Sequence, residues 1–485
     1  MNATTESLSE SRVELFNPYN GEQVFSAPAE TFESVADKAR EAQAASRQWA
    51  QLPPAERAAA LRAALEYFDR QREAITAGMT REMGKPLHAA AEELDFMLER
   101  ARYMCEFAEQ GALDPVDLSQ WWDQGFQGRI DYRAKGVVYV ISPWNYPLFC
   151  AINGSICALL AGSAVLLKHT TTPSVGEHFE RAFGSLAGID HLLQHVLVDF
   201  ATSARIIEQA DIDHVVFTGS VRGGRDIAAS VARRCANDLP NPFIQCSLEL
   251  GSNDAAYIAA DADIDDAAFW TVRIGRLHNA GQSCCAVKRV YAHQDIYDQY
   301  LERARAIMAE QVSGDPTDTN TTLGPLFGGR ARIDELLSMV GEARQRGARV
   351  VHGGDTETIG PCLFLQPTLL ADCDHSMAVM REETFGPVLP VMPVADDQQA
   401  IEQVQDSRYG LTSSIFTASR ERAEQYIKAM DTGTVYVNAC NFVDARLGWI
   451  GYRHSGNGSL ALSPPGLRAY SAPQSININP ARLHE

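Results

Sequence analysis

Hydrophobic residues recur at three- to four-residue spacing through the first quarter of the chain. Segments such as 55–68 place charged residues between the apolar ones, which is the pattern of an amphipathic helix. We therefore expect helices from about Glu30 to Gly111, after a turn at 17–21 that is marked by its Pro and Asn-Gly. The Gly84-Lys85-Pro86 sequence is expected to break this helical region once.

From Gly136 the pattern changes to short runs of β-branched and aliphatic residues that alternate with helix-like stretches. The predicted strands are Val137–Ile141, Ala164–Leu167, His195–Val198, His214–Phe217 and Ile244–Leu250. Such alternation predicts parallel strands with right-handed crossovers in an open, doubly wound α/β sheet of Rossmann type. Ligands of these sheets bind at the carboxyl ends of the strands.

A second alternating set begins near Asp261 and predicts a second α/β domain. Its strands are expected at Arg289–Ala292, Arg349–Val351, Val388–Met392 and Thr434–Val437, with a helix at Tyr297–Gln311. A chain of 485 residues exceeds what one hydrophobic core usually covers, so two or more domains are expected. Gln127–Tyr132 and Ser475–Asn479 are typical of extended segments, either an accessory sheet or interface, or exposed edge strands.

Charge and composition narrow the range of partners. The formal net charge of −20 argues against a nucleic-acid partner, and no run approaches the ~20 apolar residues of a membrane span. The first ten residues are polar and acidic, unlike a secretory signal. The ten cysteines form no Cys-x-x-Cys pair or Cys/His cluster, so no metal site is expected, and a reducing cytoplasm is the predicted location.

Two residues carry the strongest chemical signal. Glu249 lies in Ser-Leu-Glu-Leu-Gly-Ser, and Cys284 ends Asn-Ala-Gly-Gln-Ser-Cys. A thiol is a good nucleophile near neutral pH, and a nearby carboxylate can take a proton from water or from the thiol. Gly281 is expected to let backbone approach a reacting carbonyl. Covalent catalysis through a thioester needs both a nucleophile and a base.

Asn145 follows the predicted strand Val137–Ile141, within Pro-Trp-Asn-Tyr-Pro. Its carboxamide can donate a hydrogen bond to a developing oxyanion. The alternative interpretation is a Pro-fixed turn in which Asn145 caps the next helix, and the two roles are compatible.

Three further segments suggest a nucleotide. Lys168 closes a strand, where it can bind ribose hydroxyls or phosphate, although such a lysine is more often solvated. Gly219 and Ser220 open a helix whose N–H groups suit a pyrophosphate, without forming the G-x-G-x-x-G fingerprint. In Glu-Glu-Thr-Phe-Gly-Pro, Glu383 can hold ribose hydroxyls and Phe385 can pack on a flat heterocycle, the alternative being a surface turn.

These segments, in this order, resemble the aldehyde dehydrogenase superfamily over nearly the whole chain. The matching pieces are Asn17–Glu22, 82–86, Pro143–Pro147, Lys168, Phe217–Ser220, Leu248–Gly251, Asn279–Cys284, 323–325, Glu382–Pro387 and Gly433–Asn438. The resemblance implies a cofactor-binding domain (1–117 and 136–250), a catalytic domain (251–465) and an oligomerisation segment with a hairpin (118–135 and 466–485). It also implies a homodimer or homotetramer.

The resemblance assigns a role to each candidate. Cys284 attacks a small-molecule aldehyde, and the oxyanion is held by the Asn145 side chain and the Cys284 backbone N–H. Hydride passes to a nicotinamide, and water activated by Glu249 hydrolyses the thioester. The implied cofactor contacts are Trp144, Lys168 at the adenosine ribose, Thr171, Gly219 and Ser220 at the pyrophosphate, and Glu383 with Phe385 at the nicotinamide end. Cys285 is expected to point away from Cys284 and to line the pocket.

The cofactor and the substrate are less closely specified. Thr171 stands where many family members have a Glu that repels a 2′-phosphate, so NADP is slightly favoured over NAD. The chain leans toward the bacterial succinate-semialdehyde dehydrogenase branch, in which an arginine on the helix after Pro147 can bind the substrate carboxylate; here Asn153 stands there. The remaining predicted pocket residues, which suggest an apolar mouth, are Tyr146, Phe149, Cys150, Phe442 and Trp449.

Two segments of the chain depart from the family pattern. Residues 237–242 form an insertion that is expected to be a surface loop, and Pro464-Pro465 argues against a helix near the C-terminus.

A CoA-acylating enzyme is disfavoured by Glu249, because that route needs no water-activating base. A non-catalytic binding or structural descendant is disfavoured by intact Asn145, Glu249 and Cys284.

Overall fold

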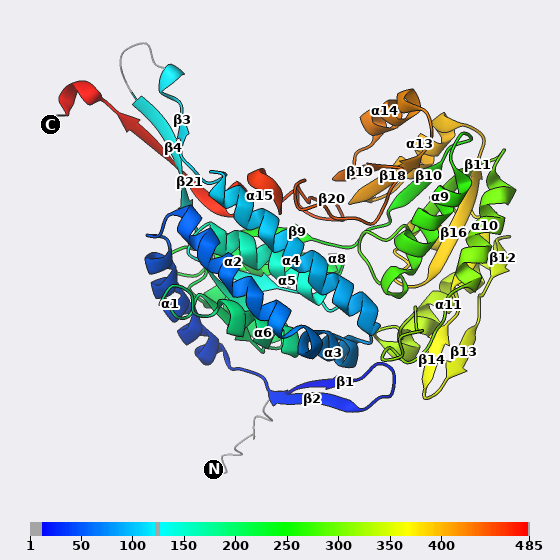
Figure 1. Cartoon of the computed structure of the whole chain (residues 1–485), viewed down its shortest axis with the longest axis horizontal. Coiled ribbons are helices and arrows are strands. Elements are labelled where there is room, and N and C mark those ends of the chain that lie inside the picture. Colours follow the sequence, from blue (N-terminus) through cyan, green and yellow to red (C-terminus); the bar gives the residue numbers. More distant parts are fainter. Residues whose placement is uncertain (1–11, 122–126, 484–485) are drawn as a thin grey trace.

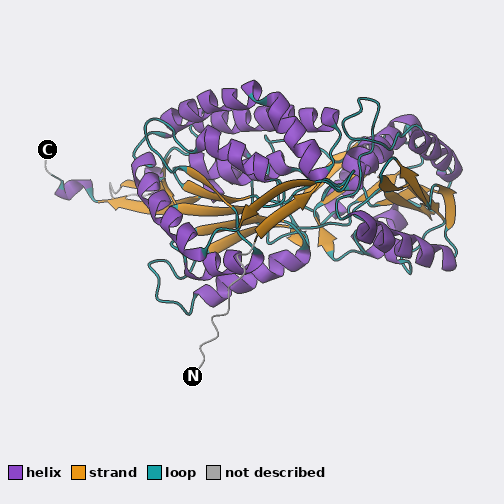
Figure 2. Cartoon of the chain, turned by 90° about the horizontal axis from the view of Figure 1, so that it is seen from below, coloured by secondary structure: helices purple, strands orange, loops and turns teal. Residues whose placement is uncertain are grey.

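The computed structural model describes residues 12–121 and 127–483. Two large sheets organise the described chain, and a long, narrow three-stranded sheet projects from one of them (Figure 1). Helices cover both faces of the strand layer (Figure 2). The α/β fold predicted from the sequence is confirmed. The sequence pattern at 1–10 lies outside the described residues.

The first sheet is parallel and has the strand order β7-β6-β5-β8-β9. Its strands are β5 Val137–Ile141, β6 Ala164–Lys168, β7 Leu193–Val196, β8 His214–Thr218 and β9 Gln245–Glu249. The chain runs outward from β5 to β7 and then returns to β8, so the topological switch point lies between β5 and β8. That is where an open α/β sheet binds its ligand.

Four of these five strands were predicted to within one residue at each end. The exception is β7, which begins at Leu193 and ends at Val196, so the prediction of His195–Val198 is two residues late. Register explains the shift, because Leu193 pairs with Val165 and Val196 pairs with Lys168. The helices around this sheet are α5 Pro147–Leu160, α6 Pro173–Phe183, α7 Phe200–Gln209 and α8 Val221–Arg234.

The N-terminal helical region is broken three times rather than once. It forms α1 Phe32–Trp49, α2 Pro54–Arg70, α3 Arg72–Met83 and α4 Leu87–Glu109. Pro54 begins α2 because proline suits a first helical turn, and Gly84 ends α3 with a φ of 79°. The hairpin β1 Arg12–Phe16 and β2 Gln23–Pro28 precedes these helices, and its turn includes Tyr19, whose ring lies 6.4 Å from that of Phe364.

The second sheet has the order β12-β15-β16-β11-β10-β18-β19, and β12 is its one antiparallel strand. Its strands are β10 Ala255–Ile258, β11 Arg289–His293, β12 Arg349–His352, β15 Thr368–Ala371, β16 Val388–Val394, β18 Thr412–Phe416 and β19 Thr434–Val437. Its helices are α9 Ile264–Ala268, α10 Tyr297–Ala309, α11 Gly329–Gln345, α12 Ala378–Arg381, α13 Asp397–Gln405 and α14 Arg420–Ala429. The second α/β unit is confirmed, although β10, β15 and β18 were not predicted.

Smaller strand pairs complete the fold. The hairpin β13 Thr356–Ile359 and β14 Cys362–Leu365 lies beside the second sheet, and β17 Tyr409–Gly410 pairs with β20 Tyr452–Arg453. In the projecting sheet, β4 Gln127–Ala134 pairs with both β21 Ser471–Ile478 and β3 Val116–Asp117. The two extended segments predicted from the sequence therefore pair with each other.

The predictions for the two segments that depart from the family pattern compare differently with the structure. Residues 237–242 form a loop without helix or strand, as predicted. The expectation of no helix at Pro464-Pro465 is wrong, because α15 spans Ser463–Ala469. Both prolines lie in its first turn, where an N–H would have no intrahelical partner and a proline costs little.

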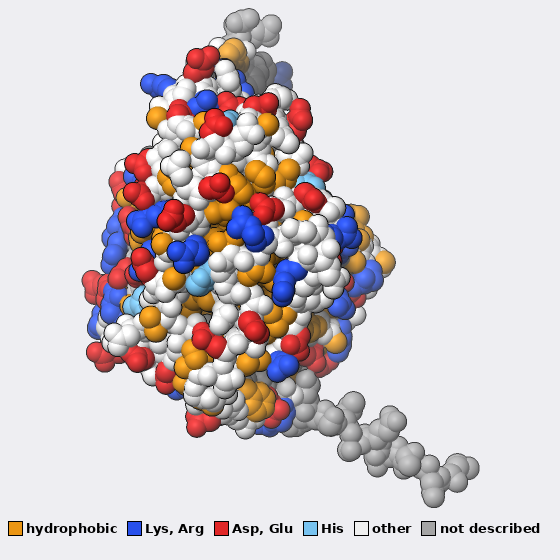
Figure 3. Space-filling view, turned by 90° about the vertical axis from the view of Figure 1, so that its right-hand side faces the viewer, with side chains coloured by type: hydrophobic (Ala, Val, Ile, Leu, Met, Phe, Trp, Pro, Cys, Tyr) orange, Lys and Arg blue, Asp and Glu red, His pale blue; other side chains and the backbone are white. Residues whose placement is uncertain are grey.

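The surface is mixed in charge on the face drawn in Figure 3, where acidic and basic side chains are interspersed. Among the described residues, no helix combines the length and the apolar character needed to cross a membrane. All ten cysteines are free thiols.

Candidate active site

A cavity of about 1290 Å³ brings together candidate residues from distant parts of the sequence. Its walls come from α4, the β5–α5 loop, the carboxyl ends of β8 and β9, and the segments 283–285, 382–385 and 441–449. The predicted residues that line it are Trp144, Asn145, Tyr146, Phe149, Cys150, Asn153, Gly219, Ser220, Glu249, Cys284, Cys285, Glu383, Phe385, Phe442 and Trp449. Lys168 and Thr171 do not line it.

The loop before Cys284 has an unusual backbone. Asn279, Ala280 and Gly281 all have positive φ, between 52° and 74°. A Cβ atom on Gly281 would lie 2.3 Å from the carbonyl oxygen of Gly386, so only glycine fits. Gly281 therefore allows two protein segments to pack closely against each other.

Arg276 ties the same two segments together. Its guanidinium donates to the carbonyl oxygens of Gly281 (2.7 Å) and Thr384 (2.8 Å). Arg276 is fully buried, so these bonds are protected from water. The nucleophile loop and the segment that carries Glu383 are thereby held as one unit.

Lys288 holds the backbone at Cys284 through hydrogen bonds. Its Nζ donates to the carbonyl oxygens of Ser283 (2.9 Å) and Cys284, and to Ser252 Oγ (2.9 Å). The same Nζ lies 3.5 Å from Glu383 Oε1, which also accepts from the Ser252 N–H (3.0 Å). Lys288 therefore links the candidate nucleophile to a candidate cofactor contact.

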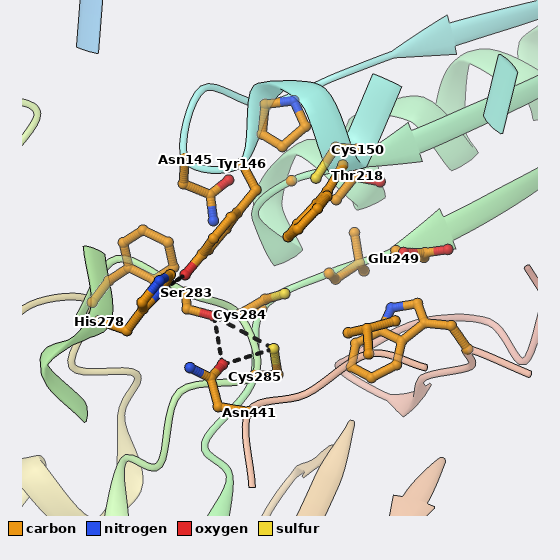
Figure 4. A pocket seen from close by; sticks show the side chains of 18 of the residues that line it. Asn145, Tyr146, Cys150, Thr218, Glu249, His278, Ser283, Cys284, Cys285 and Asn441 are labelled. Carbon is orange, nitrogen blue, oxygen red and sulfur yellow. Dashed lines mark hydrogen bonds between the residues drawn. The ribbon is translucent and has the colours of Figure 1, made fainter. Parts of the chain in front are cut away.

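The two adjacent thiols interact. Cys285 Sγ lies 3.1 Å from Asn441 Oδ1, and Figure 4 shows these side chains on one side of the cavity with Asn145 and Tyr146 on the other. The pKa of Cys284 is raised well above its usual value by its hydrogen bond with Cys285 and by burial, while Lys288 opposes the rise. Cys285 lines the cavity, and its hydrogen bond with Cys284 shows that it does not point away from it. The raised pKa of Cys284 favours its thiol form.

Glu249 ends β9 and is buried, with 8% of its surface exposed. Burial raises the pKa of Glu249 to about 7, opposed by the charge of Arg100 and by a hydrogen bond from the Trp449 side chain. A base is most effective when its pKa lies near the working pH. This carboxyl can therefore both accept and release a proton near neutrality.

Asn145 is held in place by its backbone as well as its side chain. Its carbonyl oxygen accepts from Lys85 Nζ (2.8 Å) and from Asn279 Nδ2 (2.9 Å), and its own Nδ2 donates to the Gln282 carbonyl (3.1 Å). Since a carboxamide has two N–H groups, one remains for a ligand.

A buried ion pair fixes the loop that carries Asn145. Lys85 is paired with Glu93, and Glu93 Oε1 accepts from the backbone N–H groups of Leu148 (2.8 Å) and Phe149 (3.2 Å) at the start of α5. Lys85 and Glu93 were not named as site residues. The signal was available, since Lys85 belongs to the 82–86 match.

The cofactor side of the cavity contains a helix N-terminus and a cluster of rings. Ser220 caps α8 by accepting from the Gly223 N–H (3.1 Å). The Trp144 ring stacks on Phe327 at 4.3 Å and meets Phe385 edge-on at 5.8 Å. Arg332, which lines the same side, keeps one buried nitrogen, Nη2, without a hydrogen-bond partner among the described residues.

Lys168 and Thr171 lie outside this cavity, at the end of β6 and just after it. Lys168 Nζ donates to Thr170 Oγ1 (3.0 Å) and lies 5.3 Å from the exposed Phe200 ring. Burial lowers the pKa of Lys168 to about 8. Both residues lie at the carboxyl end of β6, the strand next to β5: Lys168 is its last residue and Thr171 lies in the loop that follows.

The substrate side is aromatic but not wholly apolar. Tyr146 stacks on Phe149 at 5.7 Å, and its hydroxyl lies 2.7 Å from His278 Nδ1. Asn153 does not face an anion directly: its Oδ1 accepts from Arg100 (2.9 Å), a cavity residue on α4. Arg100 was missed because it comes from a helix that the sequence pattern marked only as amphipathic.

Among the described residues, no group of three or more His, Cys, Asp or Glu side chains could hold a metal ion.

The chain matches known proteins over nearly its whole length. The model of the aldehyde dehydrogenase family matches residues 4–476. The succinate-semialdehyde dehydrogenase [NADP(+)] of Deinococcus radiodurans is 32% identical, over 96% of this chain and 94% of its own length. The peroxisomal aminoaldehyde dehydrogenase 1 of Malus domestica is 31% identical over 93% and 90%. The structure of an NAD-dependent aldehyde dehydrogenase from Sinorhizobium meliloti has a TM-score of 0.90 and 26% identity, covering 99% of this chain and 93% of that chain.

Proposed function

The chain belongs to the aldehyde dehydrogenase family and oxidises aldehydes with NAD(P), and on that premise we propose that Cys284 is its nucleophile, Glu249 its base and Asn145 its oxyanion donor. The observation that carries this proposal is their meeting in one cavity, although they come from three separate segments of the chain. The N-terminus of α8 and Glu383 line the same space.

Acylation begins with the neutral Cys284 thiol. Glu249, with a pKa of about 7, takes its proton as the sulfur adds to the aldehyde carbon. The negative charge that develops on the former carbonyl oxygen is stabilised by the Asn145 side chain and the Cys284 N–H. Bound NAD(P) would supply the acceptor for the hydride of the thiohemiacetal carbon, and loss of that hydride would leave a thioester on Cys284.

Deacylation uses the same base. Glu249 first gives the proton that it took from Cys284 to solvent. It then takes a proton from water as the water oxygen adds to the thioester, and the C–S bond breaks to release the acid while that proton passes to the Cys284 sulfur and restores the thiol. The buried position of Glu249 in this cavity favours hydrolysis over transfer to CoA, because the latter does not need a carboxylate here.

The residues present fit a dinucleotide. The N–H groups that open α8 suit a pyrophosphate, and the unpartnered Arg332 Nη2 supplies a buried donor to oxygen atoms in the same space. Gly219 and Ser220 would hold the pyrophosphate, Glu383, Phe385 and Trp144 the nicotinamide end, and Lys168 the adenosine ribose. Since Thr171 is neutral, it would not repel a 2′-phosphate, so we favour NADP slightly over NAD.

We also propose the domain division 1–117 with 136–250, 251–465, and 118–135 with 466–485. The first unit would hold the five-stranded sheet and the second the seven-stranded sheet, which supports these boundaries. The third would hold β4 and β21 of the projecting sheet, whose short strand β3 falls at the end of 1–117. β21 is an edge strand of the projecting sheet, so we propose that this sheet forms the contacts of a homodimer or homotetramer. Ten free cysteines support a cytoplasmic location.

One assay tests the function. Purified protein is given a panel of aldehydes with NAD or NADP, and the reduced cofactor is followed by absorbance. We expect turnover without CoA, and a loss of at least ~10⁴-fold in Cys284→Ala. A requirement for CoA would contradict the hydrolytic route, and undiminished turnover in Cys284→Ala would remove Cys284 from the mechanism.

A further inference from the structure

Arg100 is a buried cation in the wall of the substrate side of the cavity. It lies on α4 with Phe96 and Tyr103, at helical spacings of four and three residues, and all three line the cavity. Only 5% of the Arg100 surface is exposed, and its Cζ lies 4.3 Å from the Phe149 ring centroid.

The charge of Arg100 has no partner of opposite sign. Its guanidinium donates to Asn153 Oδ1 (2.9 Å) and to the Val443 carbonyl (3.3 Å), and no ion pair joins it to any carboxylate in the ranges 12–121 and 127–483. A guanidinium has five N–H groups, so most of its hydrogen-bonding capacity is unused. Burial accordingly lowers the pKa of Arg100.

Other cations around the cavity are neutralised. Lys85 pairs with Glu93, Lys288 lies near Glu383, and Arg446 is bound through two of its nitrogens to Asp444. Arg276 is also buried without a carboxylate, but its Nη1 and Nη2 bond to backbone carbonyls and to Thr384, and it does not line the cavity. Arg100 therefore combines an unneutralised charge with access to the substrate space.

We propose that Arg100 binds a carboxylate at the far end of the substrate, so that the preferred substrates are aldehydes carrying a carboxylate a few carbon atoms from the carbonyl. This rests on the proposed function, in which Cys284 attacks that carbonyl. Asn153, on the helix where an arginine was sought, orients Arg100 instead. A guanidinium suits a carboxylate because its fork presents two parallel N–H groups.

The acidic side chains nearby leave room for this role. Glu92 lies at the mouth 3.9 Å from His278, Asp444 is engaged by Arg446, and Glu99 is exposed to water. Glu249 feels the Arg100 charge, which lowers its pKa. A variant at Arg100 can therefore disturb the base as well, and the test has to separate the two effects.

The test compares 4-oxobutanoate with butanal, two four-carbon aldehydes that differ in a terminal carboxylate or methyl group. Assays at pH 8.5, above the pKa of Glu249, remove the effect on the base. In wild type, we expect 4-oxobutanoate to have a kcat/KM at least ~10-fold above that of butanal. In Arg100→Gln, kcat/KM for 4-oxobutanoate should fall roughly 10- to 100-fold, mainly through KM, as expected for a lost hydrogen bond to a charged group. The value for butanal should change less than about threefold.

Arg446→Gln is the matched control, since it removes a cavity arginine whose charge Asp444 already neutralises. This variant should leave the ratio of kcat/KM for 4-oxobutanoate to kcat/KM for butanal unchanged. Equal losses for both aldehydes in Arg100→Gln, or a selective loss in Arg446→Gln alone, would overturn the proposal.

Wild-type enzyme provides a second measurement that does not depend on folding of a variant. Succinate should inhibit butanal oxidation competitively, and butanoate should inhibit at least ~10-fold less well. One contrary result is that the enzyme oxidises butanal but shows neither a preference for 4-oxobutanoate nor selective inhibition by succinate. That result would contradict the role of Arg100 and leave the proposed function intact. No turnover of any aldehyde would instead remove the proposed function itself.

Discussion

The catalytic end and the adenosine end of the proposed site differ in how firmly their side chains are held. At the catalytic end, Cys284 and Asn145 are fastened through their backbone carbonyls by the buried cations Lys288 and Lys85. At the adenosine end, the Lys168 ammonium donates to the hydroxyl of Thr170, two residues further along the chain, beside the exposed ring of Phe200.

This difference in how firmly the side chains are held matches two different tasks: chemistry at the catalytic end and recognition of the cofactor at the adenosine end. Groups that stabilise a transition state must be held in place before reaction, and buried donors to backbone carbonyls provide that rigidity. Groups that recognise a remote part of the cofactor contribute binding, which tolerates a looser arrangement. Substitutions at the catalytic end should therefore lower kcat strongly, whereas those at the adenosine end should redistribute affinity between cofactors.

After Cys284→Ala, the largest effect is expected for Glu249→Gln. Without a base, hydrolysis of the thioester should slow by ~10²- to 10⁴-fold. Acylation should be less impaired, because a thiolate fraction forms without the base at high pH. Rapid mixing at pH 9 should show a burst of reduced cofactor close to one equivalent of enzyme. A uniform loss without a burst would contradict the assignment of Glu249 to deacylation.

Asn145→Ala should cost about 10²- to 10³-fold in kcat, the usual effect of removing one oxyanion donor. Asn145→Asp is a useful companion, because it keeps the shape of the side chain while placing a negative charge beside the oxyanion, so it should be at least as damaging. Steady-state assays should show little change in KM. A loss confined to KM would mean that Asn145 only binds substrate.

The pH profile should report the buried carboxyl. Burial raises the pKa of Glu249 to about 7, and the ionised form is the base, so kcat/KM should rise with pH through 7 and fall about tenfold per unit below it. The wild-type profile with a neutral aldehyde measures this limb, and Arg100→Gln should shift it to higher pH because the Arg100 charge lowers that pKa. An unshifted limb would separate Arg100 from Glu249.

Lys288→Met tests the link between the two ends. Methionine keeps the length but removes the ammonium group that donates to the Ser283 and Cys284 carbonyls and lies 3.5 Å from Glu383. We expect a loss of stability of about 3 kcal/mol and a rise of about tenfold in KM for the cofactor. Thermal unfolding measures the loss of stability, and titration with cofactor measures the change in KM. Lys428→Met on the exposed helix α14 is the control and should change neither.

The strands of the first sheet and the catalytic trio were predictable because they are local in sequence. A fully buried parallel strand such as Val137–Ile141 is an uninterrupted apolar run, and Cys284 lies in a distinctive motif. The strands β10, β15 and β18 are four or five residues long and contain Ala, Ser and Thr, so their pattern is weak until parallel neighbours bury them.

The residues that hold the trio were beyond local patterns. Lys85 donates to Asn145, Arg100 donates to Asn153 and Lys288 lies near Glu383, across separations of 60, 53 and 95 positions in the chain. A lysine in a sequence looks solvated, and only the packing shows that Lys85 and Lys288 are fully buried and what they contact. The α15 prolines teach the same lesson, because their effect depends on which turn of the helix they occupy.

Thr171→Glu should have the smallest effect, confined to cofactor choice. A carboxylate at this position would accept the adenosine ribose hydroxyls of NAD and repel a 2′-phosphate, so the ratio of kcat/KM for NADP to that for NAD should fall by about fivefold to tenfold. Thr171→Val, similar in shape and uncharged, should keep the wild-type ratio. Saturating-cofactor assays should show kcat within about twofold of wild type for both variants, since Thr171 lies outside the cavity that holds Cys284 and Glu249. A matching fall in kcat would show that the adenosine end is as strictly coupled to the chemistry as the catalytic end, and the separation of chemistry from recognition would not hold.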